Sequence, residues 1–275
     1  MSDAGFFYEN IVGRALLGVM MRTGCFKLAE HYLKSGLSKG RIAKFIVKNG
    51  IDMSPYGDKE YKSFAEFFSR KKDGILYDFE PDVLISPCDG LLSIYKVSKD
   101  SAFPVKGSLY RVSDVIEDEN TASLFNGGMC FIFRLEASDY HHLCAFDDLE
   151  REETHYIPGK LHSVQPVACE RYPVYRLNRR WWTLLHTKNF GDAVQVEVGA
   201  MAVGGVSRTD AEKLKRAEDM GAFELAGSTV MLFLTADVCN SLDIYEKFYQ
   251  TLNGEKEVRL SMGEGIGRLM HEKAE

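Results

Sequence analysis

Three short segments of this 275-residue chain carry side chains that could act in catalysis. The first ends in an Asp-Gly turn at Asp89, the second contains the adjacent histidines His141 and His142, and the third has Ser228 directly after Gly227. A serine hydroxyl can attack a carbonyl carbon when a base removes its proton and a carboxylate orients that base. The chain offers these residue types in the order Asp, His, Ser. Because Gly227 has no side chain to hinder its carbonyl, the bond between Gly227 and Ser228 is the candidate point of attack.

Each segment also has an ordinary structural interpretation. An Asp-Gly pair after Pro commonly caps the backbone donors of a turn, and a Gly-Ser pair before a buried strand is usually a turn as well. Ser228 itself lies in neither a GxSxG elbow nor an SxxK motif that would activate it. The two histidines and Cys144 could bind a metal, but no second His/Cys pair at ligand spacing supports a zinc site, so we predict none. Neighbouring side chains of a strand point to opposite faces, so at most one of the two histidines enters a given site.

These segments lie in a chain that changes from helical to strand periodicity. In the first third, apolar residues recur at three- and four-residue spacing, and glycines separate the stretches 11–20, 28–33 and 42–46. From about residue 84 the spacing becomes two, in the segments 91–97, 130–135, 194–203 and 229–234. We therefore expect an α+β fold, with a helical N-terminal region followed by a mostly antiparallel β domain. The charged segment 210–220 is predicted to be an exposed helix.

Composition narrows the class of protein. Hydrophobic residues make up 45% and charged residues 27% of the chain, which excludes a disordered or low-complexity protein. A net charge of −6 argues against a nucleic-acid partner. The six cysteines are scattered without a CxxC pair, as expected for reduced thiols on the cytosolic side of a membrane. No run of about 18 apolar residues is present, and Asp3 stands where a secretory leader would be basic.

The N-terminal region has a charge of its own. Between Arg14 and Lys48 there are eight Lys or Arg residues and one acidic residue, Glu30. A basic amphipathic segment on an acidic protein suits an anionic lipid surface, although a solvated helix face has the same pattern.

Six motifs together resemble the phosphatidylserine decarboxylase family. They are similar to its SFxxFFxR, SPxDG, DYHR, IPGxLxSV, VGAxxVG and GxFxxGSTV segments, and they lie at residues 63–70, 86–90, 139–142, 156–164, 198–204 and 220–230. Each motif alone is modest, but six in the family's order are specific.

The resemblance implies a self-processing enzyme. Ser228 would attack the Gly227 carbonyl, and the resulting ester would eliminate, so that the chain is cut between residues 227 and 228. The small fragment, 228–275, would then begin with a pyruvoyl group made from Ser228, which acts as an electron sink in place of a bound cofactor. The resemblance further implies decarboxylation of phosphatidylserine to phosphatidylethanolamine in phospholipid biosynthesis.

One position departs from the family pattern. The family stretch usually reads YHRxH, whereas this chain has His142 in place of the arginine and Cys144 in place of the second histidine. Either His141 serves as the base, or His142 and Cys144 contribute, or self-cleavage is impaired. A thiol of ordinary pKa is mostly protonated at pH 7 and is a poorer base than imidazole, so we favour His141.

The sequence thus predicts a carboxy-lyase with Asp89, His141 and Ser228 as catalytic residues and a pyruvoyl group generated from Ser228. Residues 1–56 are expected to form a membrane-associating helical region and 57–275 the catalytic β domain. The expected partners are a phospholipid substrate, a peripheral membrane surface at the cytoplasmic face of the cell membrane, and the chain's own two fragments, with a homodimer left open. Two alternatives remain: a pyruvoyl decarboxylase of a soluble amino acid, and a processing-impaired homologue that binds lipid without catalysis.

Overall fold

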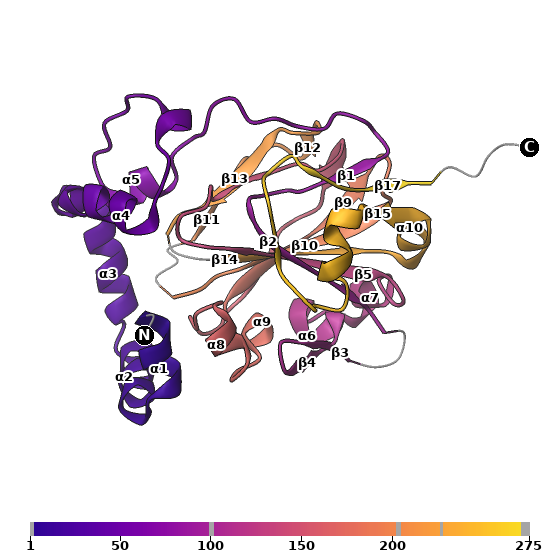
Figure 1. The fold of residues 1–275 in the computed structure, drawn as a ribbon. Coiled ribbons are helices and arrows are strands. Elements are labelled where there is room, and N and C mark those ends of the chain that lie inside the picture. The colour runs from indigo at the N-terminus through magenta and orange to yellow at the C-terminus, as the bar shows by residue number, and fades with distance from the viewer. Residues whose placement is uncertain (1–2, 99–101, 202–204, 226–227, 271–275) are drawn as a thin grey trace, which may run out of the picture.

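The computed structural model describes residues 3–98, 102–201, 205–225 and 228–270. Its first third is helical, as the spacing of apolar residues predicts, and Figure 1 shows these helices gathered on one side of the β domain. The helical elements are α1 (Asp3–Glu9), α2 (Ile11–Arg22), α3 (Cys25–Lys34), η1 (Gly36–Arg41), α4 (Ile42–Asn49), η2 (Ser54–Tyr56) and α5 (Phe64–Phe68), where η denotes a 3-10 helix. The Asn10 side chain accepts a hydrogen bond from the Val12 N–H at the start of α2, and Gly50 ends α4 with a φ of 60°.

The β domain is built on one large antiparallel sheet, which confirms the predicted α+β class. Its spatial order is β12-β7-β9-β10-β14-β5-β2-β16, and β8 also pairs with β9. The strands are β2 (Gly90–Lys96), β5 (Met129–Leu135), β7 (Leu149–Arg151), β8 (His155–Ile157), β9 (Arg180–Thr187), β10 (Asp192–Val198), β12 (Lys213–Leu214), β14 (Ser228–Leu234) and β16 (Val258–Leu260). The four strands predicted from alternation are β2, β5, β10 and β14, and they are neighbours at the centre of this sheet. Strand β10 ends at Val198, before the predicted end at residue 203, which lies outside the described residues.

Smaller antiparallel sheets and short helices cover the large sheet. The strands of these sheets are β1 (Val83–Ile85), β17 (Gly265–Leu269) and β15 (Leu242–Ile244); β11 (Val206–Arg208), β13 (Asp219–Phe223) and β6 (His142–Cys144); and β3 (Phe103–Val105) with β4 (Ser108–Tyr110). The short helices are α6 (Val112–Ile116), α7 (Glu119–Ser123), α8 (Pro166–Cys169), α9 (Val174–Leu177), α10 (Ala236–Ser241) and η3 (Glu246–Thr251). In Figure 1, α6 to α9 lie below the large sheet and the sheet of β11, β13 and β6 lies above it.

The central strand β14 is buried along its whole length. Val230 and Leu232 belong to the hydrophobic core on one face of the sheet, whereas Met231 and Phe233 belong to the core on the other face. This alternation follows from the two-residue period of a strand, with both faces covered. As a consequence, the first residue of β14, Ser228, is fully buried.

Aromatic side chains join the N-terminal helices to the β domain. Tyr8 of α1 is fully buried in the core below the sheet, and its hydroxyl accepts a hydrogen bond of 2.7 Å from the Ser163 N–H. Phe67 and Phe68 of α5 form a buried cluster with Leu225. The helical region therefore contacts the β domain close to the segment that leads into β14.

The helix predicted for residues 210–220 is wrong. This segment forms β12, a turn and the start of β13. Although its composition suits a helix, Leu214 pairs with Leu149 at the edge of the sheet, and the Arg216 guanidinium donates to the backbone carbonyls of Asp78, Phe146 and Val83. These tertiary contacts outweigh a local helix preference of a few tenths of a kcal/mol per residue.

Candidate functional site

The three candidate segments meet at one end of the large sheet. Ser228 opens β14 and pairs in register with Leu135, the last residue of β5. On the other side of β5, Leu91 pairs with Arg134, so Asp89 lies directly before the start of β2 at the same end. Gly90 is required here, since it has a φ of 152° and an added Cβ would lie 2.9 Å from the Arg134 carbonyl oxygen.

Ser228 is an unusual serine. Its side chain is fully buried, and its Oγ has no hydrogen-bond partner among the described residues. Leaving a buried hydroxyl unpaired costs about 1–3 kcal/mol, so such groups are rare and often mark a reactive position. The other half of the predicted cleavage bond, Gly227, lies outside the described residues.

His141 is held as a neutral imidazole. Its Nδ1 donates to the Asp139 carbonyl oxygen at 2.9 Å, which leaves a lone pair on Nε2, and this atom is buried without a partner in the described part of the chain. Burial lowers the pKa of His141 to about 3, with the nearby Arg70 guanidinium contributing. The Phe68 ring packs on the imidazole, with 4.1 Å between ring centroids.

The backbone of His141 also lies against the segment that leads to the cleavage bond. Its carbonyl oxygen accepts a 3.0 Å hydrogen bond from the Phe223 N–H, five residues before Ser228. The backbone of His141 is therefore next to the β13–β14 connection, whereas its Nε2 makes no hydrogen bond to Ser228 Oγ.

His142 is fully engaged by other groups. Its Nε2 faces the Ser69 carbonyl oxygen at 3.1 Å, and its Nδ1 faces the Asp219 carboxylate at 3.1 and 3.2 Å. Both ring nitrogens are therefore already engaged by oxygen atoms other than that of Ser228. Although burial opposes ionisation of Asp219, hydrogen bonds from His142 and Lys71 lower its pKa to about 2. His142 thus ties α5 to β13 and does not compete with His141 as a base.

Asp89 is half-buried and is bound by backbone groups. Its Oδ1 accepts from the Met262 N–H at 2.7 Å, and its Oδ2 from the Tyr140 N–H at 3.4 Å. Within the described residues its carboxylate bonds to neither histidine. Asp89 therefore fixes the backbone immediately before His141, and any effect on that imidazole passes through Tyr140.

Cys144 lies beside the Asp89 turn. Its N–H donates to the Pro87 carbonyl oxygen at 2.8 Å, and its thiol lies 3.7 Å from the Ser86 carbonyl oxygen. Burial raises the pKa of this thiol far above its usual range. The position that carries the second histidine in the family motif is thus next to Asp89, but here it holds a protonated thiol that is unsuited to act as a base.

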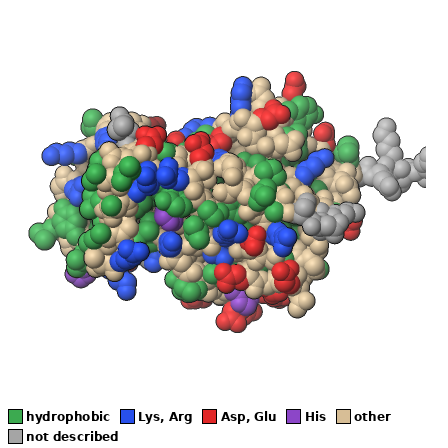
Figure 2. All heavy atoms as spheres, turned by 90° about the horizontal axis from the view of Figure 1, so that it is seen from below, with side chains coloured by type: hydrophobic (Ala, Val, Ile, Leu, Met, Phe, Trp, Pro, Cys, Tyr) green, Lys and Arg blue, Asp and Glu red, His purple; other side chains and the backbone are tan. Residues whose placement is uncertain are grey.

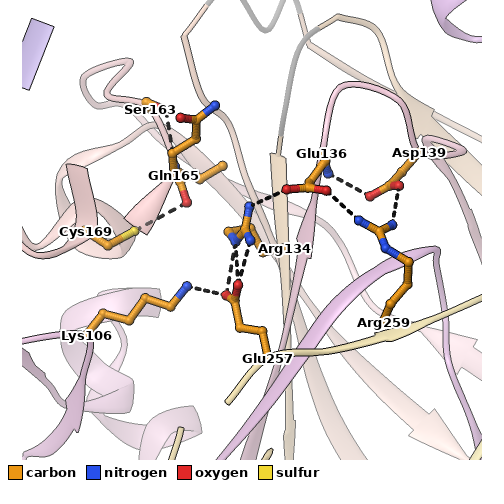
Figure 3. Close-up of polar contacts among 10 residues, drawn as sticks. Lys106, Arg134, Glu136, Asp139, Ser163, Gln165, Cys169, Glu257 and Arg259 are labelled. Atoms are coloured by element: carbon orange, nitrogen blue, oxygen red, sulfur yellow. Dashed lines mark hydrogen bonds and ion pairs between the residues drawn. The ribbon is translucent and has the colours of Figure 1, made fainter. Parts of the chain in front are cut away.

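Charged residues that the sequence analysis did not single out line the same end of the sheet. Figure 3 shows a chain of alternating charges that ends at Asp139, whose carbonyl holds His141. Its members, in order of contact, are Lys106, Glu257, Arg134, Glu136, Arg259 and Asp139. One signal for these residues was present in the sequence, because Arg134 interrupts an otherwise apolar strand. A charge in such a strand needs a buried partner, but the partner Glu257 is 123 residues away.

A second group that the sequence analysis missed surrounds His162. Its Nδ1 lies 3.4 Å from the Tyr8 hydroxyl, its ring stacks on Tyr172 at 4.7 Å, and its Nε2 is buried without a partner in the described residues. Burial lowers the pKa of His162 to about 4. In the sequence, only the family-like segment 156–164 marked this region, and no residue spacing singled out His162.

Comparison with known proteins tests the resemblance directly. The sequence profile of the phosphatidylserine decarboxylase family matches residues 63–268. Phosphatidylserine decarboxylase proenzyme 2 of Clostridium acetobutylicum is 36% identical over 95% of this chain and 90% of its own length. The phosphatidylserine decarboxylase proenzymes of Clostridium kluyveri and Desulfitobacterium hafniense are each 34% identical over 94% of this chain, and 90% and 89% of their own lengths. The resemblance inferred from six motifs is confirmed: this chain belongs to the phosphatidylserine decarboxylase family.

Proposed function

We propose that this protein is a proenzyme that cuts itself between Gly227 and Ser228 and then decarboxylates phosphatidylserine to phosphatidylethanolamine. The observation that carries the proposal is the buried, unpaired hydroxyl of Ser228 at the start of the central strand, within the family's cleavage motif. The name proenzyme, which the relatives carry, supports a processing step.

In the cleavage step, Ser228 is the nucleophile. Its Oγ attacks the Gly227 carbonyl carbon while His141 Nε2 accepts the hydroxyl proton, and the peptide bond is exchanged for an ester. Elimination then releases residues 1–227 with a free carboxylate and leaves a double bond at residue 228. Hydrolysis of the resulting enamine releases ammonia and leaves a pyruvoyl group as the first residue of the small fragment.

The surroundings of Ser228 fit such a group. When present, the pyruvoyl carbonyl bonds to the substrate amine and withdraws electrons as CO₂ departs. The backbone of residue 228 is fixed by its pairing with Leu135. Because Ser228 Oγ has no hydrogen-bond partner in the described chain, its conversion to a pyruvoyl group would break no hydrogen bond there. We assign the proton transfer to the neutral His141, whose backbone carbonyl accepts from the Phe223 N–H before β14.

We further propose that the N-terminal region binds the cytoplasmic face of the cell membrane. Within the described residues no helix is long and apolar enough to cross a bilayer. Large apolar side chains of this region are instead exposed, among them Ile11, Leu28, Leu37 and Val47. Figure 2 shows hydrophobic and basic side chains intermingled at the left, over these helices. Such a surface suits a protein that lies on anionic lipid headgroups.

The Ser228→Ala variant tests the proposed function. It should remain one chain of about 31 kDa and lack decarboxylase activity, since the hydroxyl is both the nucleophile and the source of the carbonyl. Its free energy of unfolding should equal or exceed that of the uncut wild-type chain, because a buried unpaired hydroxyl is removed. Intact mass, release of CO₂ from phosphatidylserine and urea unfolding measure these properties. Decarboxylation by an uncut Ser228→Ala protein would disprove the mechanism, and an uncut wild type would favour a lipid-binding homologue.

A further inference from the structure

A cavity of about 420 Å³ lies where the N-terminal helices meet the end of the large sheet. Its wall includes Leu135, the backbone partner of Ser228, so it opens beside the proposed reaction centre. Ala4 and Phe7 of α1 and Asn49 of α4 form the opposite wall. A lipid headgroup that arrives from the proposed membrane side would therefore pass the helices and reach residue 228 through this space.

Arg134 and Glu136 are the charged residues among the described residues that line the cavity. Both are labelled in Figure 3, and they stand one residue on either side of Leu135 in the chain. In an extended backbone, residues two apart point to the same side and are separated by about 6.5 Å. The cavity thus presents one positive and one negative group on the face of the sheet opposite to the Leu135 and Ser228 side chains, at the end of the sheet where residue 228 lies.

The Arg134 guanidinium is held in place by the Glu257 carboxylate. Its Nε and Nη2 donate to the Glu257 carboxylate at 2.6 to 3.2 Å, and Lys106 binds the same carboxylate. The side chain of Arg134 is only 7% exposed. Its remaining nitrogen, Nη1, lies 3.4 Å from Glu136, which is long for a charge-assisted hydrogen bond. Nη1 can therefore donate to an additional anionic group while Nε and Nη2 stay bonded to Glu257.

Glu136 is held in a similar way. One of its oxygens binds Arg259, which also binds Asp139 at 2.7 Å. The other oxygen makes the long contact with Arg134 and can receive a cationic group. The six charges of the chain sum to zero, so a ligand that brings one charge of each sign to this pair leaves the balance unchanged.

We infer that Arg134 and Glu136 recognise two of the three charged groups of the serine headgroup, the phosphodiester on Arg134 and the amine on Glu136; this inference rests on the proposed function. The amine and the phosphorus of that headgroup are four bonds, about 5 Å, apart, which lies between the 3.4 Å that separates the two charged groups and the about 6.5 Å between the two residues in the backbone. Glu136 follows Leu135, the backbone partner of Ser228, so an amine bound to Glu136 would lie at the same end of the sheet as residue 228. The carboxylate is the wrong anion for Arg134, because a guanidinium that binds it would stabilise the ground state and oppose the loss of CO₂.

The inference is tested with processed enzyme and dioctanoyl-phosphatidylserine in detergent micelles. Arg134→Lys should raise KM about ten- to a hundred-fold with kcat changed less than about threefold, because a lysine cannot keep the two-pronged support from Glu257. Glu136→Gln should raise KM several-fold. Arg180→Lys is the matched control: it changes another buried, ion-paired arginine, one that does not line the cavity, and should leave KM unchanged. KM values of Arg134→Lys and Glu136→Gln within twofold of the wild type would overturn the inference.

A measurement on the wild type decides the matter if Arg134→Lys does not fold. Glycerophosphoethanolamine carries both charges and should inhibit at a concentration at least tenfold lower than glycerol phosphate or ethanolamine, which carry one charge each. Equal inhibition by the three compounds would overturn the inference. A wild-type protein that is cut but does not decarboxylate phosphatidylserine would overturn the proposed function together with it.

Discussion

At the scale of single residues, two buried atoms without partners distinguish this site. Ser228 Oγ and His141 Nε2 are both buried, and neither has a hydrogen bond within the described residues. The cost of leaving them unpaired is a few kcal/mol in total, a sizeable share of the 5–15 kcal/mol that stabilises a typical domain. Ser93 Oγ and His162 Nε2 are also buried without partners, so it is the position of Ser228 within the family's cleavage motif that favours chemistry over packing here.

The identity of the base is tested by variants of the three candidates. His141→Ala should leave the chain uncut, whereas His142→Ala and Cys144→Ala should still be cut, since only His141 has a free acceptor nitrogen. Time courses of fragment formation from pH 5 to 9 measure this. With the pKa of His141 near 3, the wild-type rate should not fall between pH 7 and 5 as it would for an ordinary histidine.

The opposite result would identify a different base. Prompt cleavage of His141→Ala together with none in Cys144→Ala would assign the role to the thiol. Cys144→His places an imidazole beside the Asp89 turn, as in the family motif, and should be cut at least as fast as the wild type. A Cys144→His protein that is cut more slowly would contradict this expectation.

Buried neutral histidines also make the fold sensitive to acid. The pKa values of His141 and His162 are about 3 and 4 in the folded chain, against 6.5 when unfolded. Because the unfolded chain then binds more protons, stability falls as the pH drops below 6.5 towards these folded values. At pH 5 the loss is at most about 2 kcal/mol for each group. Urea unfolding of the Ser228→Ala chain at pH 7 and 5 measures it, and His162→Phe, which keeps the stacking on Tyr172, should remove about half of the difference.

At the scale of elements, the local spacing of apolar residues predicted those helices and strands whose buried side chains follow a single period. The apolar spacing predicted α2, α3 and α4, and the alternation predicted the four central strands, because in both cases one period dominates the burial of side chains. The end of the sheet that carries Asp89, His141 and Ser228 could also be anticipated from motifs. The partners of Arg134 and Tyr8 could not, since Glu257 and Ser163 lie more than 100 residues away in the chain.

The segment wrongly predicted to be a helix leads to a prediction of its own. Ala217 in the turn between β12 and β13 has a φ of 72°, which costs an L-residue about 1–2 kcal/mol. Ala217→Gly should therefore raise the free energy of unfolding by up to about 1 kcal/mol, after the extra flexibility of glycine in the unfolded chain is subtracted. Urea unfolding measures the change. Ala222→Gly, within β13, is the matched control and should lower stability; a loss of stability in Ala217→Gly as well would show that the turn is not strained.

At the scale of the whole molecule, the helical region and the β domain cooperate at the cavity. α1 supplies part of the cavity wall and is fixed by the Tyr8 hydroxyl, while the outer sides of the helices carry the exposed apolar and basic groups. A surface that binds lipid and a cavity that would receive its headgroup are thus parts of one assembly of helices.

Charge reversal on this surface tests the proposed membrane contact. Lys27→Glu with Lys44→Glu should weaken binding to vesicles of phosphatidylglycerol and phosphatidylcholine more than tenfold, since each basic residue near an anionic surface contributes about 1 kcal/mol. Sedimentation with vesicles at low and high salt measures it. Lys256→Glu, an exposed lysine near the C-terminus, should have little effect. Equal loss in all variants would point to net charge alone, and no loss in the double variant would remove the basis for membrane contact by this region.

The position of β14 affects whether the protein could refold after it has been cut. A cut before Ser228 leaves a small fragment of 48 residues, 228–275, whose strand β14 lies between β10 and β5 of the large fragment and whose β16 and β17 pair with β2 and β1. The two products of the proposed cleavage would therefore be interwoven and would stay together without a covalent link. Folding of the uncut chain is unimolecular, but recovery of the mature protein from denaturant would be a second-order encounter of two chains, slower on dilution. Maturation would then be irreversible in practice. The active form would arise from a precursor that folded as one chain, and its two fragments would not readily reassemble after unfolding.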